Sequence, residues 1–372
     1  RPGTVVRARG RITVMPVRPP TLRDVALRAG VHAATASRAL NPQTRSLVNE
    51  ETANRVIEVA ESMGYRPNPI ARSLKTARSA TVGLVIPDLT NPLFPPIVRG
   101  IEDVLGPAGY NAWIVNTDND PVREQSQVES LRSRHVEGLI LATARLKHPL
   151  LEQLHAEQVP MVLINRRLAS SEIPSVTPDD THGVAIAVAH LAELGHKRIA
   201  HLAGPQNTST GKLRHRAFRQ SLRDHGLDDD PDLVAVCSSW TEAEGARALR
   251  QLLDDGPQFT AVLAGNDLLA LGCYDVFGER GLSCPDDLSV IGFNDIPFID
   301  KLRPPLTSVR VPHYEIGAEA ARMLFETIPD PSRRVRSVRL PLSLVPRQST
   351  AAPASAPTRA IRHRPSGRPA AP

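Results

Sequence analysis

Short apolar runs that alternate with amphipathic stretches restrict the fold of this chain more than any other feature of its sequence. Buried strands that alternate with helices are typical of parallel sheets covered on both faces. The runs form two similar sets, at residues 81–87, 112–116, 138–142 and 161–165 and at residues 198–204, 233–236, 261–265 and 288–293. The helical stretches lie near residues 95–108, 121–134, 148–157, 181–194, 211–225, 241–253 and 266–280.

We therefore predict an α/β fold with two similar parallel-sheet subdomains and a cleft between them. Open α/β sheets bind ligands beyond the carboxyl ends of their strands. The cleft is accordingly the expected ligand site.

A different pattern precedes these runs. Leu22, Val25, Ala26 and Ala29 fall on one helical face, and a glycine follows that can end the helix. A second helix is predicted at residues 32–40. Two short helices joined by a turn with glycine are typical of a helix-turn-helix, whose second helix enters the major groove of DNA. An ordinary three-helix packing unit would have the same pattern.

A third amphipathic helix is expected to begin after Asn49, which can cap it, and to end at Gly64. A short segment then follows, with Asn68 as a cap, Pro69 at the first helical position and an end near residue 75. Such a segment is shorter than the roughly 12–15 residues that an isolated helix needs. We expect it to be helical only when something holds it.

Charge is spread unevenly along the chain. Residues 1–80 carry 14 Lys and Arg against 5 Asp and Glu, a net charge of +9, whereas residues 81–346 carry 26 against 34, a net charge of −8. The tail from Arg347 onward adds 5 Arg and no acid. A basic head on an acidic body indicates a polyanion as the partner of the head alone.

The cysteines and the apolar stretches exclude several protein classes. Cys237, Cys273 and Cys284 form no CxxC pair, so neither a disulfide framework nor a zinc site is indicated, and no metal or cofactor is expected. No apolar stretch reaches 18 residues and no signal-peptide core is present, which predicts a soluble, cytoplasmic protein without membrane contact. The chain starts at Arg1, and Met15 lies six residues before Thr21, so residues 1–14 are expected to be an extension or a start-site artefact.

Five sequence blocks between residues 21 and 75 resemble the headpiece of the LacI/GalR family of bacterial transcription regulators. They are TLRDVA (21–26), AGV (29–31), TASRALN (35–41), GYRPN (64–68) and ARSLK (71–75). The α/β region resembles the family's ligand-binding core, which is similar to periplasmic sugar-binding proteins, and PPLTSVR (304–310) resembles its crossover segment.

The resemblance and the patterns together predict the domain boundaries. A helix-turn-helix domain (21–66) and a hinge (67–79) precede an effector-binding and dimerisation core (80–349). The core is divided into an N-subdomain (about 80–179 plus 310–339) and a C-subdomain (about 180–309 plus 340–349). The ends, residues 1–20 and the Pro- and Ala-rich residues 350–372, are predicted to be disordered.

The resemblance also assigns DNA-contacting residues. It places base readout at Ala33, Ala34 and Arg38, of which only Arg38 can make a bidentate contact to guanine. The hinge leucine, Leu74, is implied to pair with its dimer mate and wedge into the minor groove, beside Ser73 and Lys75. Phosphate or mixed contacts are implied for Thr21, Thr35, Ser37 and Asn41.

His32 departs from the family, which usually has a serine cap at that place. A histidine is expected to cap poorly and to cost about 1 kcal/mol of local stability, unless its ring reaches a phosphate instead.

Effector-binding residues follow from the same resemblance. They are Phe94, Asn165, Asp179, Arg214, Trp240, Asn266 and Asn294. Core packing is an alternative role for Phe94 and Trp240. Asn165 and Asn294 replace the family's usual Asp, which removes negative charge and favours an effector with fewer donors or with a negative charge of its own. An aromatic platform with amides, a carboxylate and an Arg suits a sugar, while a nucleobase or a phosphosugar stays possible.

The function implied is that of a homodimeric, allosteric transcriptional regulator, a repressor, that binds a palindromic DNA operator and a small effector. An enzyme is the first rival, but the chain has no GxSxG, HExxH or Rossmann motif, and residues 204–212 have the wrong spacing for a Walker motif. A free solute-binding protein is the second rival, and it would lack the basic head. The tail has no leucine heptads, so a dimer is expected in preference to a dimer of dimers.

Overall fold

Two units make up the computed structural model, one of residues 1–79 and one of residues 80–372, and each has a hydrophobic core of its own. The structure describes residues 18–41, 44–66, 78–169, 172–331 and 337–354.

The described residues of the first unit form a small helical domain. Apolar side chains from its helices, most of them alanines, build its core, so the helices can pack closely. The elements are α1 (Leu22–Arg28), α2 (Ala33–Leu40), the 3-10 helix η1 (Arg45–Leu47) and α3 (Glu50–Ser62). The buried core consists of Val25, Ala26, Ala29, Ala36, Ala39, Ala53, Val56 and Ala60. The three predicted helices are therefore confirmed to within about two residues.

Local hydrogen bonds fix where these helices begin. Thr21 and Asp24 form a capping box at α1, in which each side chain bonds the other residue's backbone amide. The Asn49 side chain accepts from the Glu51 amide at 3.0 Å and caps α3 as predicted. Both helices thus start at the residues that the capping signals indicate.

The second unit contains two six-stranded sheets. All pairs in the first sheet are parallel, and so are those in the second except β10 with β12. In spatial order the first sheet is β11 (Ser337–Leu340), β5 (Ser175–Pro178), β4 (Met161–Ile164), β3 (Gly138–Leu141), β1 (Thr81–Ile86) and β2 (Asn111–Asn116). The second is β12 (Ser343–Val345), β10 (Thr307–Arg310), β9 (Ser289–Asn294), β8 (Ala261–Ala264), β6 (Ile199–Ala203) and β7 (Val234–Val236). The prediction of two parallel-sheet subdomains is confirmed.

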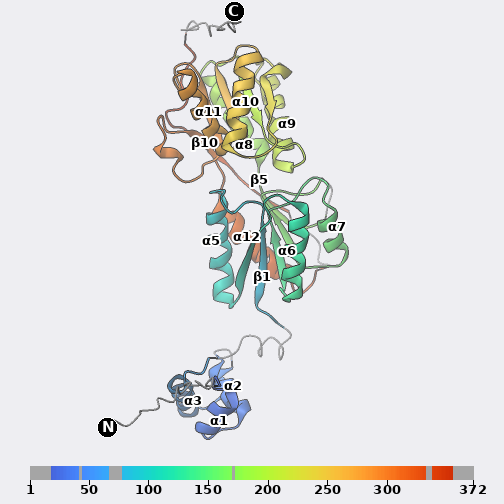
Figure 1. The fold of residues 1–372 in the computed structure, drawn as a ribbon, viewed down its shortest axis with the longest axis vertical. Coiled ribbons are helices and arrows are strands. Elements are labelled where there is room, and N and C mark those ends of the chain that lie inside the picture. Colours follow the sequence, from blue (N-terminus) through green and yellow to red (C-terminus); the bar gives the residue numbers. More distant parts are fainter. Residues whose placement is uncertain (1–17, 42–43, 67–77, 170–171, 332–336, 355–372) are drawn as a thin grey trace, which may run out of the picture. The chain divides into compact units, whose positions relative to one another are not determined.

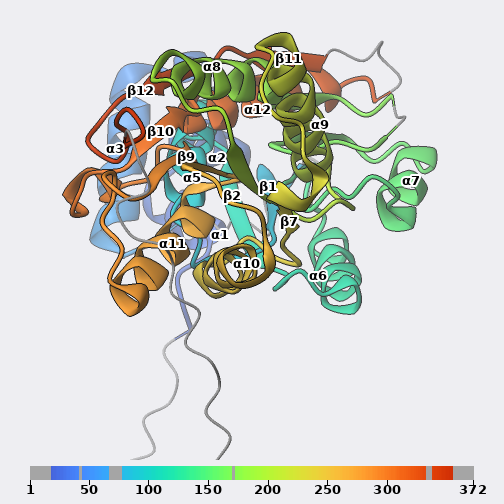
Figure 2. The ribbon, with the colours of Figure 1, turned by 90° about the horizontal axis from the view of Figure 1, so that it is seen from above.

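Helices cover both faces of each sheet. On the first sheet, α5 (Phe94–Leu105) and α12 (His313–Thr327) pack on one face, and α6 (Pro121–Ser133) and α7 (Pro149–Ala156) pack on the other (Figure 1). On the second, α8 (Asp180–Glu193) and α9 (Ser209–Asp224) lie opposite α10 (Glu242–Asp255) and α11 (Asp267–Arg280) (Figure 2). Short 3-10 helices complete the unit, η2 (Gly106–Ala108), η3 (Pro231–Leu233) and η4 (Ile299–Lys301). No helix of the described residues is long and apolar enough to cross a membrane.

The chain passes between the two sheets at three places, after β5, after β10 and after β11. The middle passage leads from β10 into α12, and it directly follows the segment that resembles a crossover, residues 304–310, whose last four residues form β10. Because the polypeptide returns to the first sheet through α12 and β11, residues far apart in the sequence build each subdomain. Several short segments thereby join the two sheets. Each sheet with its helices forms one lobe, and the two lobes lie on either side of a cleft.

Residues 350–354, which belong to the predicted disordered tail, are among the described residues and pack on the second sheet. Ser349 is fully buried, and its hydroxyl donates to the Val290 carbonyl at 2.6 Å. The Ala351 amide donates to the Ser289 hydroxyl at 3.1 Å, and the Ala351 carbonyl bonds His196 Nε2 at 2.9 Å. These bonds hold the chain against the second sheet beyond the predicted boundary. Residues 355–372 lie outside the described part.

Glycines allow α10 and α11 to touch through their backbones. A Cβ atom on Gly272 would lie 2.1 Å from the Glu242 carbonyl oxygen and 2.4 Å from the Ala246 amide nitrogen. Gly245 on α10 is equally close to the Leu269 carbonyl oxygen, at 2.2 Å. Neither backbone can move away without separating the two helices.

We expect Gly272→Ala to lower the free energy of unfolding by about 1–3 kcal/mol or more, because the added methyl group overpacks a backbone contact. Gly278→Ala, in the same helix, is the matched control, since a Cβ there meets nothing within 4 Å. It should raise stability by about 0.4–1 kcal/mol. Thermal denaturation of both variants measures the difference, and a Gly272 variant as stable as the Gly278 variant would contradict the close approach.

Candidate functional site

On α2, the second helix of the first unit, some of the residues that were predicted to contact DNA are exposed to solvent. Ala34 and Arg38 are exposed, and the Arg38 guanidinium donates to none of the described residues. Thr35 and Ser37 are half-buried. Ala33 is also half-buried and packs against the alanine-rich core, so much of its methyl group is used within the domain.

The two residues that flank these helices have local structural roles. The Thr21 hydroxyl donates to the Asp24 carboxylate at 2.6 Å, and this bond is the main reason that the pKa of Asp24 is lowered. Asn41 follows α2 as its C-cap and is half-buried. Contact of either residue with a phosphate stays a prediction.

The prediction that His32 caps α2 poorly is wrong. His32 Nδ1 accepts a hydrogen bond from the Ala34 amide at 3.2 Å, in the place where a serine hydroxyl would act. An imidazole nitrogen that accepts must be unprotonated, so the ring proton of the neutral form lies on Nε2. The exposed ring therefore keeps one donor, directed away from the cap.

The predicted hinge residues Ser73, Leu74 and Lys75, with the segment 67–77 that contains them, lie outside the described residues.

A cavity of about 400 Å³ opens between the two sheets of the second unit. Its walls follow the carboxyl ends of strands from both sheets, which is where the cleft was expected. Of the residues predicted to bind the effector, those that line it are Phe94, Asn165, Arg214, Trp240, Asn266 and Asn294.

Asp179 is the one predicted cavity residue that does not line the cavity. Its carboxylate accepts from the His182 amide at 3.2 Å and caps α8. The next residue, Asp180, is buried and accepts from Arg214 Nε at 2.7 Å. The carboxylate that serves the cavity is thus one position further along the chain, and it acts through Arg214.

Arg214 is held rigidly from three sides. Besides the Asp180 contact, its Nη1 donates to the Gly265 carbonyl at 2.7 Å, and its guanidinium lies 3.7 Å over the Phe293 ring. Its Nη2 donates to no acceptor of the described residues, which leaves it for a ligand. Burial raises the pKa of Asp180, and the adjoining Arg214 opposes that rise.

The indole of Trp240 forms an apolar wall. It packs so close to the backbone that a Cβ on Gly204 would lie 2.0 Å from the ring, and one on Gly265 would lie 3.1 Å from it. The two glycines therefore make room for the indole at the edge of the second sheet. Phe94, from the first subdomain, is 2% exposed and belongs both to the core and to the cavity wall. The two alternative roles of Phe94, core packing and contact with an effector, are therefore compatible.

The asparagines of the cavity have backbone reasons for their positions. Asn165 and Asn294 have φ values of 62° and 119°, a region where asparagine is tolerated better than most residues. Asn266 caps α11, because its side-chain oxygen accepts from the Leu269 amide at 2.9 Å. The replacement of Asp by Asn at 165 and 294 is thus no direct indication of the charge of the effector.

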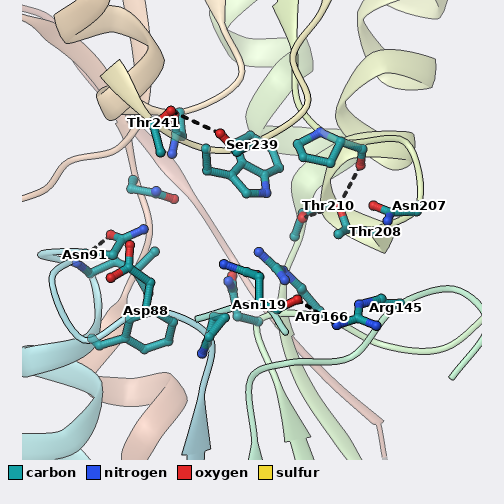
Figure 3. A pocket seen from close by; sticks show the side chains of 18 of the residues that line it. Asp88, Asn91, Asn119, Arg145, Arg166, Asn207, Thr208, Thr210, Ser239 and Thr241 are labelled. Atoms are coloured by element: carbon teal, nitrogen blue, oxygen red, sulfur yellow. Dashed lines mark hydrogen bonds between the residues drawn. The ribbon is translucent and has the colours of Figure 1, made fainter. Parts of the chain in front are cut away.

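Several polar cavity residues were missed by the sequence reasoning. They also follow strand ends or begin helices, and that position was the one signal that could have found them. They are Asp88, Asn91, Asp118, Asn119, Arg145, Arg166, Asn207, Thr208, Thr210, Ser238, Ser239 and Thr241 (Figure 3). Hydroxyl, amide and guanidinium groups outnumber carboxylates in this set. Such a lining offers many hydrogen-bond partners to a hydroxylated ligand.

Two family models match the chain. One, for bacterial regulatory proteins of the lacI family, matches residues 21–68. The other, for periplasmic binding proteins and the sugar binding domain of the LacI family, matches residues 79–348.

Similar proteins are named as repressors. The chain is 33% identical over 330 residues to the ribose operon repressor of Halalkalibacterium halodurans, with 89% of this chain and 97% of that protein covered. It is 36% identical over 307 residues to the transcriptional repressor CytR of Escherichia coli K12, with 82% and 89% covered. The solved lac repressor dimer bound to operator and an anti-inducer superposes with a TM-score of 0.81 at 28% identity, with 90% of this chain and 100% of that chain covered.

Proposed function

We propose that this chain, which belongs to the LacI family of bacterial regulatory proteins, is a repressor. It acts as a homodimer on a palindromic operator and responds to a sugar effector. The chain is a DNA-binding transcriptional regulator and not an enzyme. A cytoplasmic location is part of the proposal, because the operator DNA lies there.

One observation carries the proposal. The same chain holds a helical domain with an exposed Arg38 on its second helix and a separate two-sheet unit with a polar cavity lined by both subdomains. A free solute-binding protein needs the second unit but has no use for the first. A symmetric dimer presents two reading helices to two half-sites, which is why a palindrome is proposed.

The chemistry of the cavity supports a sugar. Trp240 supplies an apolar face, Arg214 offers a free Nη2, and the amide nitrogen of Asn266 donates to none of the described residues. Flat apolar surfaces beside fixed donors suit a ring that carries hydroxyl groups. A ligand that contacts both subdomains favours the closed state of the cleft, and closure can change the operator affinity of the dimer.

The test uses the full chain. An operator is selected from randomised DNA, and its affinity is measured by fluorescence anisotropy with and without a panel of sugars and nucleosides. We expect at least one sugar to change the operator affinity by roughly 5–150-fold, the usual range of allosteric coupling. Failure of every sugar to change it, with a nucleoside active instead, would reject the sugar proposal and keep the regulator.

A further inference from the structure

One cation in the cavity forms no ion pair with any described residue. The side chain of Arg166, directly after β4, lines the cavity although the residue is only 8% exposed. Its guanidinium makes no hydrogen bond or ion pair with any described residue, and its Nε is buried without a partner. Every Asp and Glu of the chain lies in the described ranges, and none of these side chains forms an ion pair with Arg166.

The surroundings add to this positive charge. Burial is the main reason that the pKa of Arg166 is lowered to about 10, the nearby Arg214 and Arg145 lower it further, and Glu124 opposes the shift. Arg166 is still cationic at neutral pH. Leaving a buried charge uncompensated is strongly destabilising, so a lone buried guanidinium in a cavity indicates a counter-ion that comes with the ligand.

Two of the nearby carboxylates have partners of their own, and the third, Glu124, attracts Arg166 electrostatically without a hydrogen bond or ion pair to it. Asp88 accepts from the amide and the hydroxyl of Thr90, at 2.9 and 2.6 Å, and Asp118 pairs with Arg123. Glu124 is fully buried and accepts from the Thr143 hydroxyl. It also lies 3.3 Å from His148 Nε2 and 3.8 Å from Arg145 Nη2.

The other wall of this end of the cavity belongs to the second subdomain. Thr208 caps the 16-residue helix α9 by accepting from the Gly211 amide at 3.2 Å, which places the positive end of the helix dipole at the cavity. Figure 3 shows Arg145 and Arg166 at the same end as Asn207, Thr208 and Thr210, while Asp88 and Asn91 lie at the opposite end. Residues 204–212, which only imitate a Walker motif, thus lead into a helix start that faces an unpaired arginine.

We propose that the effector is a phosphorylated sugar whose phosphate binds between Arg166, Arg145 and the start of α9. This inference rests on the proposed effector role of the cavity. Two guanidinium groups and a helix N-terminus provide more donors than one carboxylate can accept, whereas a phosphate dianion has three terminal oxygens for them. The sugar ring then extends toward Trp240 and Phe94. Because the phosphate contacts both subdomains, it supplies the charge that closes the cleft.

Titration calorimetry on the full chain tests this with matched pairs, ribose against ribose 5-phosphate and glucose against glucose 6-phosphate, with glucuronate and inorganic phosphate as further probes. We expect one phosphosugar to bind at least about 100-fold more tightly than its neutral partner. The variant Arg166→Met should remove most of that preference, because it weakens binding of the phosphosugar far more than binding of its neutral partner. Arg250→Met, on the outer surface of α10 and paired with Glu279, is the control and should change neither.

A second readout separates binding from structure. If Arg166 is an unpaired charge that awaits a ligand, Arg166→Met should keep or raise the melting temperature of the free protein, whereas a structural arginine would lower it. Equal affinity for neutral and phosphorylated sugars, or equal loss of both in the variant, would overturn the phosphate site and leave the proposed function intact. Preference for glucuronate alone would replace the phosphate by a carboxylate. No binding of any sugar would count against both proposals.

Discussion

Arg38→Ala is expected to lower the preference of the protein for its operator by roughly 5–150-fold while leaving its binding to random DNA nearly unchanged. Arg38 is exposed on α2, and its guanidinium bonds none of the residues that the structure describes. A bidentate contact to guanine contributes about 1–3 kcal/mol of discrimination, which is roughly 5–150-fold in affinity. The neighbouring reading positions are alanines, so no second polar side chain on this part of the helix can replace the contact. Competition between operator and random duplexes at several salt concentrations measures both quantities.

The control is Arg38→Lys, which keeps the positive charge and removes the planar fork. It should lose most of the discrimination and keep the salt dependence of binding, since that dependence follows the number of phosphates neutralised. Far-ultraviolet circular dichroism should be unchanged in both variants, because the side chain is outside the alanine-rich core. Equal loss of affinity for operator and random DNA would refute base readout by Arg38.

Local signals explain why the first unit could be predicted closely. The capping box of Thr21 and Asp24 and the cap at Asn49 are contacts between residues two or three positions apart, so the sequence contains the whole interaction. His32 shows the limit of the same reasoning. Its residue type argues against a cap, yet its ring geometry allows Nδ1 to reach the Ala34 amide.

In the second unit, the apolar runs became strands, and the elements that were missed are the 15-residue helix α12 and several short polar strands. β5, with the sequence SVTP, is fully buried although two of its four side chains carry hydroxyl groups. Its burial comes from β4 and β11 on either side, and β11 lies far away in the sequence. β12 likewise depends on a strand that is distant in the sequence, because it pairs with β10. Such strands depend on tertiary pairing, which a periodicity search does not contain.

The cavity shows a similar division. The strand-end rule and the family resemblance located the cavity and most of the residues chosen for it, because parallel strands bring their carboxyl ends to one edge. They could not decide between Asp179 and Asp180, since adjacent residues at a helix start point in different directions. Nor could they single out Arg166, whose importance lies in having no partner. Pairing is a property of the three-dimensional arrangement alone.

Asp180→Ala is expected to lower the free energy of unfolding of the second unit by about 3–5 kcal/mol, because it leaves the buried Arg214 without its carboxylate. The pair is 2.7 Å apart, with side chains 4% and 3% exposed, so water cannot substitute for the lost partner. Thermal and urea denaturation of the ligand-free protein measure the loss.

Asp179→Ala is the adjacent control. It removes only the cap of α8 and should cost about 0.5–2 kcal/mol. The double variant Asp180→Leu/Arg214→Met should recover much of the loss, since replacing both members of a buried ion pair by apolar side chains of similar volume is often neutral. If Asp180→Ala is no more damaging than Asp179→Ala, the charge of Arg214 is satisfied by some other group, and the ion pair with Asp180 does not carry the stability assigned to it.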